Sequence, residues 1–98
     1  MRIGIVTESS PGETRVAGTP STVSQLVKLG YEVVVEAGAG EWASYPDADY
    51  IASDVAIVDK AQAWNADVVL KLNAPNEAEL AQLKSGATVV SWLSPGLN

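Results

Sequence analysis

The strongest constraint on the fold is the alternation of short apolar runs with segments that carry helix signals. Each run is continuous and rich in Val, Ile and Leu, and none shows the apolar–polar alternation of a half-exposed strand. Such runs are typical of parallel strands whose two faces are both covered by helices. The five runs span residues 2–6, 31–36, 55–58, 68–72 and 87–93. They predict a three-layer α/β/α domain with a parallel five-stranded sheet.

Two of the intervening helices have clear start signals. Thr19 is a good N-cap, and Pro20 follows at the first helical position, where its missing N–H is not needed. Asn76 precedes Glu79 by three residues, which is the spacing of a capping box. With strand–helix alternation and right-handed crossovers, we expect the strand order 2-1-3-4-5.

The charge balance and the missing residue types exclude several kinds of function. Twelve acidic residues against six basic ones give a net charge of −6, which argues against nucleic acid or an anionic membrane as the main partner. The chain has no cysteine and no histidine, so thiolate chemistry, imidazole acid–base chemistry and the usual zinc sites are excluded. We therefore expect no metal site. With no secretory leader pattern and no long apolar stretch, a cytoplasmic location is expected.

The whole chain, residues 1–98, is expected to form one domain without a separate linker. No helix signal follows the fifth strand, and its apolar residues therefore lack an obvious cover. These residues are Val89, Val90, Trp92 and Leu93. Either the domain is compact and minimal with a covered edge, or the 98 residues are the front part of a longer polypeptide that is truncated at its C-terminal end.

A glycine motif follows the second strand. Gly38 to Ala43 matches G-x-G-x-x-A, and Asp59 lies about 20 residues further on, as in a dinucleotide-binding fingerprint. That fingerprint requires a helix that opens at the glycines, and Pro46 interrupts any helix there. We interpret the motif as a plain glycine turn and expect no cofactor-binding residue in this chain.

Asp59 also ends the third strand, where a phosphorylated receiver aspartate would lie. Receiver chemistry needs an acidic pair after the first strand and a lysine at the fifth. Glu8 is a single acid, and Lys84 is the nearest lysine. Asp59 is therefore interpreted as a turn residue.

Arg15 and Lys71 are the candidate binding residues. Arg15 follows the first strand, and Lys71 interrupts the apolar fourth strand, where an unpaired ammonium would be costly. Ligands of open α/β sheets bind at the carboxyl ends of the strands, and two strand spacings of roughly 10 Å would let both side chains reach one carboxylate. The alternative is that Arg15 pairs with Glu8 or Glu13 and that Lys71 extends to solvent at the strand end.

Three tryptophans, Trp42, Trp64 and Trp92, are spread along a chain without phenylalanine. We interpret them as core or interface residues rather than as a platform for stacking a ligand.

Several motifs along the whole chain resemble the N-terminal domain of alanine dehydrogenases and NAD(P) transhydrogenase alpha subunits. The segments that carry this resemblance are residues 1–8, 13–17, 19–20, 29–40 and 69–75. The resemblance implies a flavodoxin-like first domain, with the dinucleotide-binding domain, and therefore NAD(H), in a later part of the parent protein.

The resemblance also implies site residues. The arginine and lysine that match Arg15 and Lys71 bind the substrate in alanine dehydrogenases, which carry a histidine shortly after the fifth strand. This chain has no histidine, and residues 71–75 and 92–95 look more like a transhydrogenase alpha subunit. In that family hydride passes between NAD(H) and NADP(H), coupled to proton translocation through membrane-embedded components, and the parent is expected to be a homodimer.

Three classes of function remain open. In the first class, the chain is the N-terminal portion of a transhydrogenase alpha subunit, inactive alone and without catalytic residues of its own. Alternatively, it is the substrate domain of an alanine dehydrogenase-like enzyme that binds pyruvate or alanine. The third class is a stand-alone, non-catalytic binding module.

Overall fold

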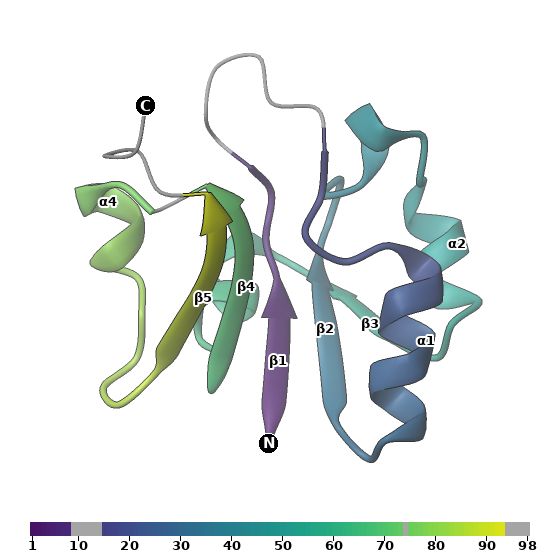
Figure 1. The fold of residues 1–98 in the computed structure, drawn as a ribbon, viewed down its shortest axis with the longest axis horizontal. Coiled ribbons are helices and arrows are strands. Elements are labelled where there is room, and N and C mark those ends of the chain that lie inside the picture. The colour runs from purple at the N-terminus through teal and green to yellow at the C-terminus, as the bar shows by residue number, and fades with distance from the viewer. Residues whose placement is uncertain (9–14, 74, 94–98) are drawn as a thin grey trace.

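The computed structural model describes residues 1–8, 15–73 and 75–93. Strands and helices alternate along the chain as the apolar runs predict (Figure 1). In order, the elements are β1 (Arg2–Ile5), α1 (Pro20–Lys28), β2 (Glu32–Glu36), the short 3-10 helix η1 (Glu41–Ala43), α2 (Asp47–Ile51), β3 (Ala56–Val58), α3 (Lys60–Trp64), β4 (Val68–Asn73), α4 (Glu77–Leu80) and β5 (Thr88–Leu93).

The strands form one parallel five-stranded sheet, so the predicted fold class is confirmed. The predicted order 2-1-3-4-5 is wrong in one respect. The observed order is β3-β2-β1-β4-β5, in which β1 lies between β2 and β4 and β3 lies at the edge. This is the first part of the order found in dinucleotide-binding doubly wound sheets rather than the flavodoxin order.

Close packing of α3 on β1 explains the observed order. A Cβ atom on Gly4 would lie 2.2 Å from the carbonyl oxygen of Ala63 and 3.1 Å from the Cβ of Ala66. Only a glycine in β1 lets α3 pass this near to the strand. The chain therefore crosses behind β1 after leaving β3, and β4 pairs with the free edge of β1.

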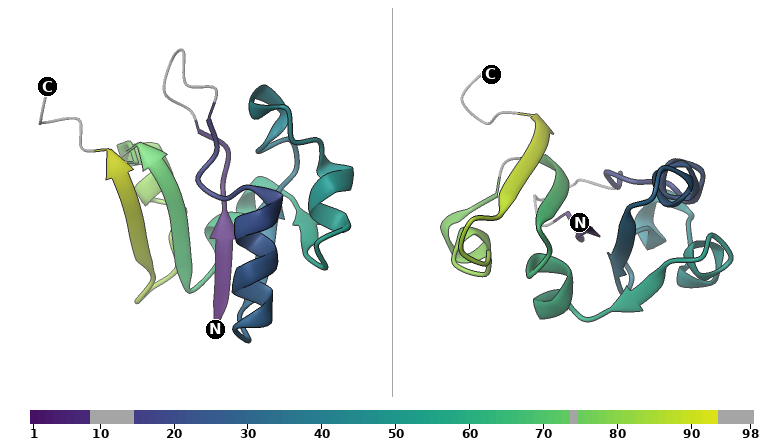
Figure 2. Two further views of the ribbon diagram at one scale, coloured as in Figure 1. Left: turned by 45° about the vertical axis from the view of Figure 1, so that its right-hand side comes forward. Right: turned by 90° about the horizontal axis from the view of Figure 1, so that it is seen from below.

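Helices cover both faces of the sheet (Figures 1 and 2). Helices α1 and α2 lie on the face toward the viewer in Figure 1, here called the front face, over a core that includes Ile5, Val23 and Tyr50. Helix α3 lies on the opposite, back face over a second core built around Val6, Trp64 and Val69. Helix α4 lies on this back side beside β4, and its neighbour Leu83 packs against the second core.

Local capping fixes where three helices begin. The Thr19 side chain accepts a hydrogen bond from the Thr22 amide at the start of α1, and Pro20 is the first helical residue, as predicted. Asn76 and Glu79 form the predicted capping box of α4. Asp59 caps α3 by accepting from the Gln62 amide, which gives it a structural role at the end of β3.

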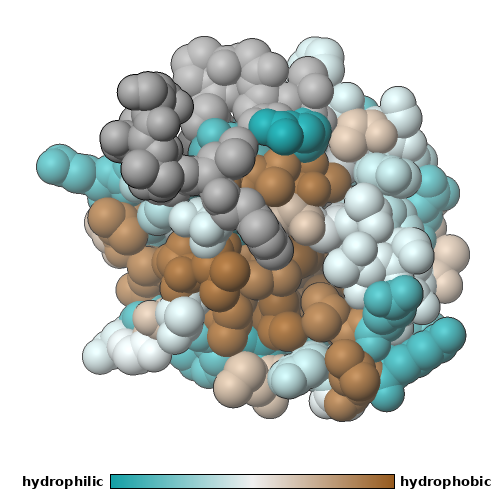
Figure 3. Space-filling model, in the orientation of Figure 1, coloured by the Kyte–Doolittle hydropathy of each residue, from teal (hydrophilic) through white to brown (hydrophobic). Residues whose placement is uncertain are grey.

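The front face of β4 and β5 lies outside the cover of α1 and α2 (Figures 1 and 3). Val68, Leu70 and Leu72 of β4 are half-buried there, and Val90, which pairs with Leu70, is exposed. The side chains of Trp92 and Leu93 lie outside the described part of the structure. None of the helices in the described residues has the length and apolar character needed to cross a membrane.

Candidate functional site

The carboxyl ends of β1 and β4 are where a binding site is expected, because the strand order reverses between these two neighbours. The chain leaves β1 toward β2 on one side and returns later to place β4 on the other side. In open α/β sheets ligands bind in the crevice at such a reversal of strand order. The residues that follow β1 and those that end β4 therefore define the candidate site.

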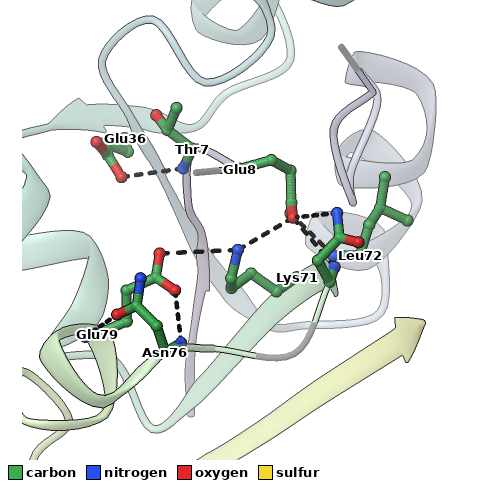
Figure 4. Close-up of polar contacts among 8 residues, drawn as sticks. Thr7, Glu8, Glu36, Lys71, Leu72, Asn76 and Glu79 are labelled. Carbon is green, nitrogen blue, oxygen red and sulfur yellow. Dashed lines mark hydrogen bonds and ion pairs between the residues drawn. The ribbon is translucent and has the colours of Figure 1, made fainter. Parts of the chain in front are cut away.

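Two consecutive residues after β1 tie the chain to both neighbouring strands. The Thr7 amide donates a hydrogen bond of 3.0 Å to the Glu36 carboxylate at the end of β2. Glu8 reaches the other way, to the end of β4 (Figure 4). The connection that leads toward Arg15 therefore starts from a chain held on both sides of the crevice.

Lys71 lies at the centre of a buried ion cluster. Its ammonium is 3.0 Å from Oε1 of Glu8 and 3.8 Å from Oε2 of Glu79, and the three side chains are 0%, 2% and 5% exposed. A buried ammonium without such partners would be strongly unfavourable. The two carboxylates come from different elements, one after β1 and one from α4, so the cluster joins three parts of the fold (Figure 4).

Besides the bond from Lys71, the Glu8 carboxylate accepts hydrogen bonds from Leu72 and Asn73. The Leu72 amide donates to Oε2 at 2.8 Å, and the Asn73 amide donates to Oε1 at 3.1 Å. The Asn73 side-chain amide also donates to Oε1, at 3.3 Å. With Lys71 this makes four donors to one carboxylate, which uses most of its acceptor capacity.

Glu79 is held in place by the capping box of α4. Its Oε1 accepts from the Asn76 amide at 3.0 Å, and its own amide donates to Oδ1 of Asn76 at 2.8 Å. This leaves Oε2 directed at Lys71 (Figure 4). The capping motif predicted from the sequence therefore also orients a charged partner of the buried lysine.

Arg15 lies in a different environment, on the front face. It is exposed and lines a cavity of about 430 Å³, together with Val16, Thr19, Ala43, Tyr45 and Leu72. This volume lies in the range of small-ligand pockets, and a guanidinium at the wall is suited to a carboxylate. The size of the cavity and the charge of Arg15 suit a small acid.

Tyr50 supports the segment that carries Arg15. Its hydroxyl donates a hydrogen bond of 2.7 Å to the Gly18 carbonyl, and the side chain is fully buried. Burial, with smaller contributions from nearby Tyr45 and acidic residues of α2, raises the pKa of Tyr50 to about 12. The tyrosine is therefore a neutral donor throughout the physiological range.

Arg15 and Lys71, which the sequence analysis placed together, have different immediate surroundings. Lys71 is not among the residues that line the Arg15 cavity, because successive β4 side chains alternate between faces. Leu72 faces the cavity, whereas Lys71 meets Glu79 of α4 on the other side. A carboxylate site shared by Arg15 and Lys71 stays a prediction.

Sequence reasoning missed the partner of Lys71. The sequence analysis offers Glu8 as a partner of Arg15, and the other candidate, Glu13, lies outside the described residues. The signal was present, since an ammonium within an apolar strand requires a counter-charge. Glu8, three residues beyond the end of β1, became the obvious candidate only once β1 and β4 were known to be neighbours.

The glycine motif forms a turn rather than the start of a nucleotide-binding helix. Gly38 has a φ of +80°, and residues 41–43 make one 3-10 turn that ends at Ser44 with a φ of 68°. A Cβ on Gly40 would lie 2.7 Å from the Tyr50 hydroxyl. Position 40 is therefore a glycine because Tyr50 packs where a side chain would lie.

The tryptophans fall into different environments. Trp64 is fully buried in the back core, as expected for a core residue, and Trp42 in η1 is 78% exposed.

Comparison with known proteins gives one consistent set of relatives. The family model "Alanine dehydrogenase/PNT, N-terminal domain" matches residues 4–98. NAD(P) transhydrogenase subunit alpha from Haemophilus influenzae is 43% identical over 93 residues, which cover 95% of this chain and 18% of that protein. Alanine dehydrogenase from Mycobacterium tuberculosis is 42% identical over 95 residues, covering 95% of this chain and 26% of that protein.

Solved structures agree with the sequence comparison. A transhydrogenase from Sinorhizobium meliloti superposes with a TM-score of 0.89 at 41% identity, covering 93% of this chain and 27% of that chain. An L-alanine dehydrogenase superposes with the same TM-score at 32% identity, covering 93% of this chain and 26% of that chain. The chain thus spans about a quarter or less of the length of these relatives.

Proposed function

The chain belongs to the alanine dehydrogenase/PNT N-terminal domain family, and from that premise we propose that it is the N-terminal portion of an NAD(P) transhydrogenase alpha subunit. The parent protein would transfer hydride between NAD(H) and NADP(H), coupled to proton translocation. The observation that carries this choice is the absence of histidine from all 98 residues, since the resemblance assigns alanine dehydrogenases a histidine after the fifth strand.

The environment of Lys71 supports the same choice. The lysine that the resemblance assigns to substrate is here enclosed by Glu8 and Glu79 and fully buried. Its charge is already compensated by two carboxylates, so it has little to offer the carboxylate of a substrate. Under this proposal Arg15 and Lys71 are family residues without a catalytic role in this chain.

The proposal places the cofactor and the partners in other parts of the parent protein. NAD(H) would bind in a separate dinucleotide-binding domain of the same polypeptide, and membrane-embedded transhydrogenase components would be further partners. The parent would act as a homodimer on the cytoplasmic side. The open front face of β4 and β5 supports a contact with the remaining polypeptide, because Leu70, Leu72 and Val90 leave apolar surface there.

The alternative function is substrate binding in an alanine dehydrogenase-like enzyme. The observation that favours it is the Arg15 cavity, whose size and positive charge suit pyruvate or alanine. In that case Arg15 would hold the substrate carboxylate. Lys71 would have to leave Glu8 to take part.

A pair of chimaeras separates the two functions. This chain would replace the matching first segment of the H. influenzae transhydrogenase alpha subunit and, separately, of the M. tuberculosis alanine dehydrogenase. We expect the first chimaera to retain hydride transfer from NADH to an NADP analogue and the second to lose alanine oxidation. An active alanine dehydrogenase chimaera paired with an inactive transhydrogenase chimaera would reverse the assignment.

A binding experiment on the isolated chain completes the test. We expect calorimetry to show no micromolar binding of NAD(H) or NADP(H), because the glycine motif opens onto a turn rather than a helix. Pyruvate binding that is lost in Arg15→Ala, and kept in the matched exposed-cation variant Lys28→Ala, would favour the alternative.

A further inference from the structure

The Glu8 side chain lies between the ends of β1 and β4, at the point where the strand order reverses. In doubly wound sheets external ligands bind in the crevice at this point. Here the Glu8 side chain, which is 2% exposed, contacts the end of β4 instead. In the described part of the chain, the groups that bond to the Glu8 carboxylate are donors, namely the amides of Leu72 and Asn73, the Asn73 side chain and the Lys71 ammonium.

We propose that the end of β4 is a carboxylate-binding site and that Glu8 is its built-in ligand, which closes the crevice to external anions. Three of the four donors belong to the backbone and side chain of residues 72 and 73, and they contact both oxygens of the carboxylate. An ordinary ion pair would need only the lysine. The arrangement is that of a site shaped for a carboxylate group.

The charges of the cluster fit this assignment. Lys71 has a second carboxylate nearby, since Oε2 of Glu79 lies 3.8 Å from its ammonium and is oriented by Asn76. Removing the Glu8 carboxylate therefore leaves Lys71 with one compensating charge and leaves the backbone donors unfilled. A small carboxylate that enters the vacated space would restore the charge and the hydrogen bonds of the native cluster.

The tether makes Glu8 hard to displace. Glu8 follows the end of β1 by three residues, and the Thr7 amide beside it is fixed to Glu36. A ligand held this near its site acts at a high effective concentration, with which a free carboxylate competes poorly.

Formate is a suitable probe, because it contains the carboxylate group with no side chain attached. We would titrate formate into the wild-type chain and into Glu8→Ala, and follow the backbone amide resonances of Leu72 and Asn73 by heteronuclear NMR. We expect saturable shifts toward the wild-type positions in Glu8→Ala, with a dissociation constant at least about tenfold lower than any found for wild type. Thermal unfolding of Glu8→Ala should move upward with formate at constant ionic strength.

Two control variants make the result specific. Glu8→Gln fills the same space and should show no formate response at Leu72 or Asn73. Glu32→Ala removes an exposed glutamate from its ion pair with Arg2 and should show no formate-dependent stabilisation.

Each remaining outcome decides the question. A Glu8→Ala chain that folds only when formate is added supports the proposal. A chain that stays unfolded at every formate concentration, or equal responses in Glu8→Ala and Glu8→Gln, overturns it. Saturable formate binding at the Leu72 and Asn73 amides of the wild type would also overturn it, because the crevice would then be open.

Discussion

The two ends of the same sheet carry the same kinds of charged residue in opposite surroundings. At the carboxyl end, Lys71 is fully buried between Glu8 and Glu79. At the amino end, Arg2 pairs with Glu32 across the starts of β1 and β2, with side chains that are 44% and 61% exposed. Lys84 and Asp67 form a second exposed pair there.

The difference lies in desolvation and in hydrogen bonding. The buried charges have lost water, so each depends on its protein partners, and removing one partner leaves the others uncompensated. The exposed charges keep water as an alternative partner, and salt screens them. An ion pair in this fold is therefore structural at the carboxyl end and nearly dispensable at the amino end.

The largest effect should come from removing the buried ammonium. Lys71→Met removes the ammonium that two buried carboxylates contact, and we expect it to lower the free energy of unfolding by about 3–5 kcal/mol in urea denaturation. Lys84→Met, which breaks an exposed pair, is the matched control and should cost much less. Equal losses in the two variants would show that burial does not distinguish the two ends.

Alkaline pH should reveal the next largest effect. The pKa of Tyr50 is raised from 10.0 to about 12, so the unfolded chain ionises first as the pH rises. The stability from Tyr50 is complete below pH 10 and is lost between pH 10 and about 12, by up to about 3 kcal/mol. Chemical denaturation across this range, compared with Tyr50→Phe, measures it.

The Tyr50→Phe variant has its own expected cost. It removes the bond to the Gly18 carbonyl and should cost about 1 kcal/mol at neutral pH. Its stability should then fall less steeply above pH 10 than that of the wild type. Parallel curves for the two proteins would contradict the role given to Tyr50.

The capping box tests whether the buried cluster depends on its support. Asn76→Ala should cost about 1 kcal/mol for the lost cap, and more if freeing Glu79 weakens its contact with Lys71. Thr19→Ala at the start of α1 is the matched cap variant, and the contacts of Thr19 in the described residues do not include the Lys71 cluster. Urea unfolding should rank Asn76→Ala as the more damaging, and the reverse ranking would separate Glu79 from the cluster.

Changes at the amino end should be small. Glu32→Ala removes an exposed partner of Arg2, and we expect a loss of no more than about 0.5 kcal/mol that shrinks further in salt. Thermal unfolding at low and high NaCl gives the comparison. A loss as large as that of Asn76→Ala would place this pair among the structural contacts.

Asp67 should give the smallest effect, visible only in acid. A hydrogen bond from the Arg2 amide, and a second from Lys84, lower the pKa of Asp67 below 3.8. Its contribution is therefore present above pH 3.8 and disappears as the pH falls through the lowered pKa. Asp67→Asn should flatten the acid limb of the stability curve slightly. An unchanged acid limb would mean that the contacts of Asp67 add nothing.

Local features of the sequence predicted most elements, because caps and apolar runs act over a few residues. Thr19 and Asn76 start their helices as expected, and the five runs are strands. Strand order was wrong because it depends on whether α2 or α3 is the connection that crosses β1, a choice made by contacts far apart in sequence. Gly4 was the sequence signal for this crossing, since a glycine within a strand indicates that another backbone packs closely against it.

The same reasoning predicted only part of the candidate site. Lys71 was singled out because a charge in an apolar strand is unusual, and Arg15 because it follows β1. Pairing Lys71 with Glu8 requires residues 63 apart to meet, which follows only from the adjacency of β1 and β4. That Leu72 rather than Lys71 lines the Arg15 cavity follows in turn from the alternation of side chains along β4.

The central position of β1 has a consequence for synthesis on the ribosome. Of the five strands, β1 is made before the others, yet one of its two neighbours, β4, ends at Asn73. At about 5–20 residues per second, the ribosome needs roughly 3 to 14 s between the end of β1 and the end of β4. Throughout that interval β1 has an unpaired edge, the form in which a nascent strand can join another chain. Slow codons between β3 and β4 would lengthen this exposure.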